Sequence, residues 1–134
     1  MITAIDTNIL VDILGADPAH VAKSAAQLEQ ASNEGPLVIC EIVYSELSAR
    51  FIRRQVLDDF LTRIGAEFLP SGVAALFMAG KIQRDYRLAG GQRDRILADF
   101  LIGAHAISHA DRLLTRDRGF YRSCFPELQI LEGG

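Results

Sequence analysis

The chain has 134 residues, of which 49% are hydrophobic, and its formal net charge is −3. This length suits one domain, over residues 1–134, and the apolar content excludes an intrinsically disordered chain. No apolar run approaches the ~20 residues that span a bilayer, no basic region marks a signal peptide, and the negative charge argues against a simple basic nucleic-acid binder. Cys40 and Cys124 are too few for a disulfide framework, so we expect reduced thiols in a cytoplasmic protein.

The first half of the chain alternates short apolar runs with helical patterns. Short runs with β-branched residues are typical of buried parallel strands, and apolar residues at helical spacing predict helices. Asp17 and Pro18 mark a helix start, because Asp is a favoured N-cap and Pro suits the first turn. The predicted elements are a strand over 2–5, helices over 7–14 and 18–33, a strand over 37–40, a helix over 42–52 and a helix over 56–64.

The second half continues this alternation. Gly90 and Gly91 end a helix and do not form a phosphate loop, because the spacing of a nucleotide-binding glycine motif is missing. The predicted elements are a strand over 67–69, helices over 71–88 and 96–110, a strand over 113–115, a helical turn at 120–121 and a strand over 128–131. Strands separated by helices indicate an α/β domain with a central, mostly parallel sheet flanked by helices.

Three of four acidic residues fall where such a sheet places its functional crevice, beyond the carboxyl ends of the strands, and the fourth, Asp99, can face the same end. Asp6 ends the first strand, and Asp117 follows the fourth. Glu46 and Asp99 lie in early turns of the helices that carry them. We therefore expect the four carboxylates to converge at one end of the sheet.

The chemistry of these acids points to a metal ion. Asp6 and Asp99 have apolar neighbours, so their carboxylates are partly desolvated, and several such groups repel one another. A cation relieves this repulsion, and hard oxygen ligands suit Mg²⁺ or Mn²⁺. A metal ion held in this way can activate water at a phosphorus atom, so the pattern predicts hydrolysis of a phosphodiester without a nucleophilic side chain.

Each acid also has a simpler interpretation when taken alone. Asp6 and Asp117 could be N-caps of the helical segments that follow them. Glu46 could face solvent, and Asp99 could pair with Arg95 four residues earlier. These interpretations do not explain why all four acids would converge at one end of the sheet.

Four segments resemble the motifs of PIN-domain ribonucleases, specifically the VapC-type toxins of bacterial toxin–antitoxin pairs. The ordered set spans almost the whole chain, and the third segment is the most specific. The segments are Ile5-Asp6-Thr7-Asn8, Tyr44-Ser45-Glu46-Leu47, Asp99-Phe100-Leu101-Ile102-Gly103-Ala104-His105-Ala106 and Leu113-Leu114-Thr115-Arg116-Asp117. The resemblance implies a PIN-like three-layer sandwich.

The resemblance also implies a function. It implies an endoribonuclease that uses Mg²⁺ or Mn²⁺ and forms a homodimer. It also implies an inhibitory VapB-like antitoxin as a partner, and contact with DNA only through that antitoxin. Asp6 and Asp99 would be the principal metal ligands. Asn8 and Thr115 would form hydrogen bonds to the ligands. The implied acidic site is Asp6, Glu46, Asp99 and Asp117.

Two other acids compete for these roles. Glu41 directly follows the second strand, so geometry alone favours it over Glu46, whereas the resemblance favours Glu46, which is followed by Leu as in the family motif. Glu41 could instead cap its helix. Asp94 competes with Asp99 and remains a possible outer ligand.

Several arginines stand close to the acids in sequence. They could contact RNA phosphates, or they could form ion pairs that steady the acidic cluster. These arginines are Arg93, Arg95, Arg116 and Arg118. A separate basic segment after Glu46 could bind an antitoxin helix or a second protomer, although its apolar residues could equally pack in the core. This segment contains Arg50, Phe51, Ile52, Arg53, Arg54 and Leu57.

His105 and His109 have a spacing that can bind zinc, but the chain lacks an HExxH motif and a third soft ligand nearby. We expect them to be packing or surface residues.

Two further functional classes compete with a nuclease. One is a non-catalytic interaction module with a structural metal site. The other is a phosphoacceptor receiver-like domain, which would need a lysine after a late strand, whereas Lys23 and Lys81 fall in predicted helices.

Overall fold

The computed structural model describes residues 1–15, 17–92 and 95–131. Its elements alternate as the sequence predicts. In chain order they are β1 (Thr3–Ile5), α1 (Thr7–Ile13), α2 (Pro18–Glu34), β2 (Leu37–Ile39), α3 (Glu41–Ser48), α4 (Arg54–Ile64), β3 (Ala66–Phe68), α5 (Gly72–Leu88), α6 (Leu97–His109), β4 (Arg112–Leu114), α7 (Arg118–Cys124) and β5 (Gln129–Ile130).

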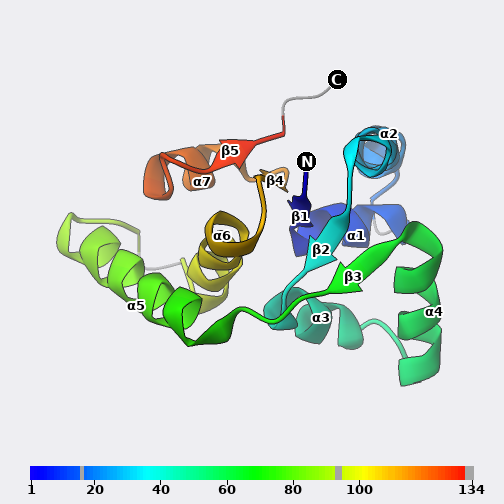
Figure 1. Ribbon diagram of the computed structural model, residues 1–134, viewed down its shortest axis with the longest axis horizontal. Coiled ribbons are helices and arrows are strands. Elements are labelled where there is room, and N and C mark those ends of the chain that lie inside the picture. The colour runs from blue at the N-terminus through cyan, green and yellow to red at the C-terminus, as the bar shows by residue number, and fades with distance from the viewer. Residues whose placement is uncertain (16, 93–94, 132–134) are drawn as a thin grey trace.

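The strands form one parallel sheet, which across the described residues has five strands in the order β3-β2-β1-β4-β5. Ala4 of the central strand β1 lies opposite Val38 of β2 and Leu113 of β4. Helices α5 and α6 lie on one side of the sheet, and α1 and α2 lie on the other (Figure 1). This arrangement confirms the predicted α/β sandwich.

The core lies on both faces of the three inner strands, because every residue of β1, β2 and β4 is buried. Helix α6 contacts β1 and β4. A Cβ atom on Gly103 of this helix would lie 2.4 Å from the ring of Phe125, the residue that follows α7, so glycine permits the close approach of this ring to α6. No helix within the described ranges is long and apolar enough to cross a bilayer.

Charged groups at the amino ends of the strands have partners. Arg112 at the start of β4 is buried, and its Nε donates a hydrogen bond to Oγ1 of Thr3 at 2.9 Å. Its Nη2 lies 3.5 Å from Oε1 of Glu34. The backbone N–H of Ile2 donates to Oδ2 of Asp111 at 2.6 Å. These contacts connect β1, α2 and β4 at this end of the sheet.

Most element boundaries differ from the predicted ones by only one or two residues, and two differ by more. Helix α3 ends at Ser48, so Phe51 and Ile52 lie in a connection and not in the predicted helix over 42–52. Their apolar character produced the helical pattern, yet Ile52 is fully exposed and Phe51 packs against the Phe60 ring of α4. The predicted helical turn at 120–121 is the centre of a longer helix, α7.

Candidate active site

Asp6 occupies the carboxyl end of the central strand. It is the N-cap of α1, where its Oδ1 accepts a hydrogen bond from the backbone N–H of Thr7 at 2.7 Å. Its Oδ2 accepts one from Oγ1 of Thr115 at 2.7 Å and one from Nδ2 of Asn8 at 3.3 Å. Asp6 is therefore a cap, as its simpler interpretation holds, but Asn8 and Thr115 also fix its second oxygen.

The environment of Asp6 opposes its charge. Only 6% of the residue is exposed. Burial raises the pKa of Asp6 to about 6, against the opposing hydrogen bonds from Thr115 and Thr7, and the charges of Glu46 and Asp99 raise it further. A cap alone needs no such neighbours, so this electrostatic coupling separates Asp6 from an ordinary helix cap.

Glu46 and Asp99 enter the same region from two helices. Oγ1 of Thr7 donates a hydrogen bond to Oε1 of Glu46 at 2.6 Å, which directs this exposed side chain toward the end of β1. Burial raises the pKa of Asp99; Arg95 opposes this, and the charges of Asp117 and Glu46 add to the rise. The structure thus brings Glu46 and Asp99 within electrostatic range of Asp6.

Asp117 is the fourth acid of the group, and it forms an ion pair with Arg95. The guanidinium of Arg95 forms a two-pronged ion pair with Asp117 and lies 4.0 Å from Oδ2 of Asp99. It also stacks over the Phe120 ring, 4.3 Å from the centroid. Asp117 makes no side-chain capping bond to α7, so its carboxylate is directed to Arg95 and not to the helix. Arg95 therefore steadies the acidic cluster.

The phenol of Tyr121 lies buried near these acids. Burial raises its pKa, and the charges of Asp6, Asp99 and Asp117 raise it further. The field of the acidic cluster therefore extends into the core behind it.

Glu41, the geometric competitor of Glu46, is engaged elsewhere. Its Oε1 accepts hydrogen bonds from the backbone N–H of Ser71 at 3.1 Å and from Oγ of Ser71 at 2.6 Å. Although burial works to raise it, the pKa of Glu41 lies below its ordinary value because Ser71 hydrogen-bonds the carboxylate. The geometry favours Glu46 for the site and gives Glu41 a role at the β3–α5 connection. Asp94 and Arg93 lie outside the described residues.

The two histidines of α6 pack against the same connection. Nε2 of His105 lies 2.8 Å from the carbonyl oxygen of Leu69, and Nε2 of His109 lies 2.5 Å from that of Ser71. His105 is buried, which lowers its pKa. Both side chains thus tie α6 to the segment that precedes α5.

Arg116 does not join the ion pairs of the acidic cluster. Its Nε and Nη2 donate to the carboxylate of Asp12, at 2.7 and 3.0 Å, and Ser24 donates to the same carboxylate at 2.7 Å. Although burial works to raise it, the pKa of Asp12 is lowered by these bonds. Sequence reasoning missed Asp12. The signal was present, because Asp12 stands between Val11 and Ile13, an apolar setting like that of Asp99.

The donor set at the strand ends suits a hard divalent cation. All four side chains offer carboxylate oxygens, and Arg95 already acts as a stand-in cation between Asp99 and Asp117. Within residues 1–15, 17–92 and 95–131, however, no three acidic, histidine or cysteine side chains lie close enough to enclose an ion. The residues fit Mg²⁺ or Mn²⁺ in type and charge, and their side chains must draw together to bind it.

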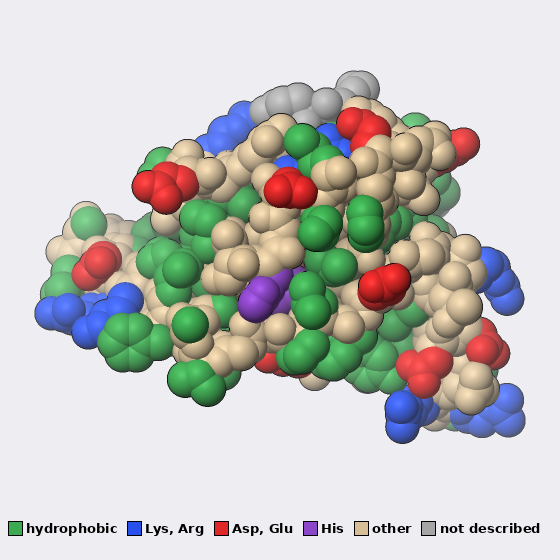
Figure 2. Space-filling view, in the orientation of Figure 1, with side chains coloured by type: hydrophobic (Ala, Val, Ile, Leu, Met, Phe, Trp, Pro, Cys, Tyr) green, Lys and Arg blue, Asp and Glu red, His purple; other side chains and the backbone are tan. Residues whose placement is uncertain are grey.

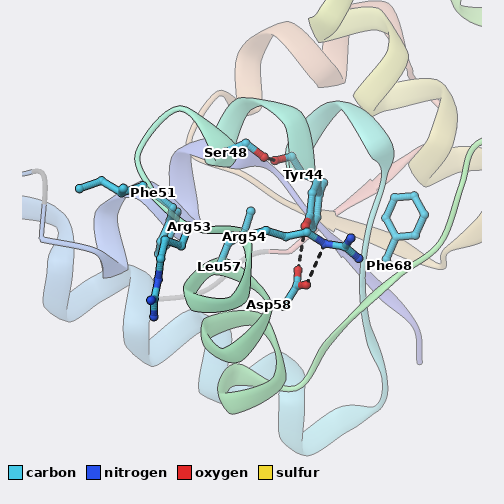
Figure 3. Close-up of a pocket in the computed structure, with 9 residues that line it drawn as sticks. Tyr44, Ser48, Phe51, Arg53, Arg54, Leu57, Asp58 and Phe68 are labelled. Atoms are coloured by element: carbon cyan, nitrogen blue, oxygen red, sulfur yellow. Dashed lines mark hydrogen bonds and ion pairs between the residues drawn. The ribbon is translucent and has the colours of Figure 1, made fainter.

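A separate hollow of about 710 Å³ lies between α3 and α4, and its lining is mostly apolar (Figure 3). At one side, the hydroxyl of Tyr44 and Nε of Arg54 both donate to Asp58, at 2.7 and 3.2 Å. The lining residues, which we call the α3–α4 groove, are Tyr44, Ser48, Phe51, Ile52, Arg53, Arg54, Leu57, Asp58 and Phe68. Much of the basic segment singled out in the sequence therefore faces this groove and not the acids.

Known proteins share the sequence pattern and the fold. A family model described as the PIN domain matches residues 3–126. The chain is similar to one in the VapBC2 structure from Rickettsia felis bound to a promoter DNA fragment, with 25% identity, a TM-score of 0.74 and 98% of both chains covered. It has the fold of a chain in VapBC-1 from nontypeable Haemophilus influenzae, with 20% identity, a TM-score of 0.72 and 98% of both chains covered. For FitAcB from Neisseria gonorrhoeae the identity is 22%, the TM-score 0.70 and the coverage 98% of this chain and 97% of the other. No curated protein sequence matches the chain.

Proposed function

Because the chain belongs to the PIN-domain family, we propose that it is a metal-dependent endoribonuclease and the toxin of a toxin–antitoxin pair. The observation that carries this proposal is the electrostatic coupling of Asp6, Glu46, Asp99 and Asp117 at the end of the central strand. A buried carboxylate with a pKa near 6, facing other carboxylates, is stabilised in its charged form by a bound cation.

The side chains of the site divide the work of holding a metal ion and a substrate. Thr115, Asn8 and the Thr7 backbone fix both oxygens of Asp6, so the ligand is oriented before the ion binds. The Thr7 hydroxyl orients Glu46 in the same way. Asp6 and Asp99 would hold Mg²⁺ or Mn²⁺, with Glu46 and Asp117 completing the acidic wall. When bound, such an ion lowers the pKa of a water molecule and offsets charge that develops at the phosphorus.

The test is cleavage of a single-stranded RNA by the purified protein in Mg²⁺ or Mn²⁺. We expect Asp6→Asn and Asp99→Asn each to lower the rate at least about a hundredfold, because each removes a charged ligand. The matched control is Asp85→Asn, which changes an exposed acid on α5 and should cleave like the wild type. Wild-type cleavage by both site variants, with their fold shown intact by circular dichroism, would overturn the site assignment. Absence of cleavage together with a rise in melting temperature on adding Mg²⁺ would instead support the non-catalytic module.

A protein partner is part of the proposal. Structures similar to this chain include VapBC and FitAcB structures, and one of the VapBC structures is bound to a promoter DNA fragment. The apolar α3–α4 groove supports an antitoxin segment as its occupant, because a mostly apolar hollow with arginines at its rim suits an amphipathic helix with acidic residues. Contact with DNA would then come through the antitoxin. Co-expression with a short adjacent reading frame, followed by purification of the complex, tests this partner.

A homodimer is the remaining proposed assembly. Hydrophobic side chains gather on the surface over α5 (Figure 2). Val73 is 83% exposed, and Phe77 is 67% exposed. Such residues on neighbouring turns of one helix support contact with a second copy of the chain. Light scattering after gel filtration should give a dimer for the wild type and a monomer for Phe77→Asp.

A further inference from the structure

A second, smaller hollow of about 260 Å³ lies between α2 and the turn that follows β4. Every side chain that lines it is neutral or basic: His20, Lys23, Ser24, Gln27, Arg116 and Arg118. We call it the α2 basic pocket. Its size is below that of pockets for drug-sized ligands, and its composition suits a small anionic group.

The α2 basic pocket is held in place from beneath. The buried carboxylate of Asp12 accepts the two bonds from Arg116 and the bond from Ser24, so one acid joins the two walls of the pocket. The bonds to Asp12 use Nε and Nη2 of Arg116, and its Nη1 carries two further N–H donors. An arginine fixed in this way loses little side-chain entropy when it binds an anion.

Lys23 supplies a second permanent charge on the opposite wall. Its side chain is exposed, and it forms no ion pair with any residue in the described part of the chain. His20, one turn earlier on α2, lies 3.5 Å from Asp17 and adds an imidazole donor. The pocket thus combines guanidinium, ammonium and imidazole groups around one small volume.

The α2 basic pocket also adjoins the acidic cluster. The backbone N–H of Arg116 donates to Oδ1 of Asn8 at 3.2 Å, and Nδ2 of Asn8 donates to Oδ2 of Asp6. Three consecutive residues therefore join the two sites: Thr115 donates a hydrogen bond to Asp6, Arg116 lines the pocket, and Asp117 belongs to the acidic cluster. A single strand that lies across the acids passes close to the pocket.

We propose that the α2 basic pocket binds a phosphate group of the RNA substrate, a phosphodiester next to the one that is cut. This inference rests on the proposed nuclease function. It gives a negatively charged protein a local site of attraction for RNA beside its acidic cluster. The competing occupant, an acidic side chain of a protein partner, is an outcome of the test below.

The test measures binding, so that it does not depend on cleavage. A fluorescent single-stranded RNA oligonucleotide is titrated with Asp99→Asn protein in Mg²⁺, with and without Lys23→Ala, over a range of salt concentrations. The matched control is Lys81→Ala, since Lys81 is the only other lysine of the chain and is exposed on α5. We expect Lys23→Ala to weaken binding roughly three- to tenfold and to reduce the slope of log Kd against log salt by about 0.7, the value for one lost phosphate contact on a single strand. Lys81→Ala should change neither quantity.

Three results would overturn the inference. The two lysine variants could bind RNA equally, or Lys23→Ala could bind RNA more weakly with an unchanged salt slope. In the third result, Lys23→Ala binds RNA like the wild type but no longer binds the protein partner. The last result would assign the pocket to an acidic side chain of that partner. Failure of the nuclease proposal looks different, because wild-type protein would then leave RNA intact in Mg²⁺ and Mn²⁺ whatever the lysine variants do.

Discussion

The two ends of the parallel sheet treat charge in opposite ways. At the amino end, Arg112 meets Thr3 and Glu34, and Asp111 accepts a backbone N–H. At the carboxyl end, four acids face one another and Arg95 pairs with only two of them, while the carboxylate of Asp6 has hydrogen-bond donors but no ion pair among the residues that the structure describes. One end is arranged for stability, and the other retains an unfavourable arrangement that a metal ion would relieve. The difference is what the proposed function predicts for the end that holds the active site.

This comparison predicts that a variant at the amino end affects stability and leaves the chemistry intact. Arg112→Ala removes a buried cation and the donor to buried Thr3, so we expect the free energy of unfolding to fall by about 3 kcal/mol. Urea titration measures this loss, with the exposed Arg63→Ala as the control. Below the unfolding transition, RNA cleavage should match the wild type. A loss of cleavage in the folded variant would mean that the two ends are not separate.

A variant at the carboxyl end should do the reverse. The folded-state pKa of Asp6 is about 6, whereas an unfolded aspartate has a pKa of about 3.9. Between these values the folded state binds more protons, so this group adds stability as pH falls from 6 toward 4 and removes it as pH rises. In metal-free buffer at pH 7, Asp6→Asn should therefore raise the free energy of unfolding by about 2 kcal/mol, and the gain should shrink toward pH 4. A gain that is the same at pH 4 and pH 7 would contradict the burial of this charge.

The smallest effect comes from the side chain that stabilises the charged form of Asp6. Thr115→Val removes the 2.7 Å hydrogen bond and keeps the shape of the side chain. The pKa of Asp6 should rise further, and the acidic limb of the pH–rate profile for RNA cleavage should move up by about one unit or less. Thr62→Val, an exposed change on α4, is the control. An unmoved profile would show that a different group sets this limb.

The sequence predicted what depends on local pattern. Short apolar runs revealed the strands, and membership of the PIN-domain family confirms the resemblance that the acidic motifs suggested. Asp6 and Asp99 were recognisable because a carboxylate among apolar residues is partly desolvated, which is unfavourable without a compensating partner. The end of α3 was placed too late, since Phe51 packs on α4 and produces a helical pattern without a helix.

Long-range pairings were beyond local pattern. Arg95 binds Asp117 across 22 residues, and Arg116 binds Asp12 across 104. Arg95 and Arg116 looked equivalent in sequence, each standing near a predicted acid. Only the arrangement of strands decides that one arginine steadies the acidic cluster while the other forms the wall of the α2 basic pocket. The acid with which each arginine pairs is therefore a property of topology.

The central place of β1 has a consequence for how the molecule comes apart. Strand β1 is paired on both sides, whereas β5 has two residues and β3 at the opposite edge leaves Glu67 and Phe68 exposed. Fraying begins at such edges, and the most protected backbone amides belong to the inner strands. Asp6 is attached to the segment expected to exchange its amide hydrogens last. A molecule that has lost an outer strand to thermal opening would still carry Asp6 on an ordered backbone.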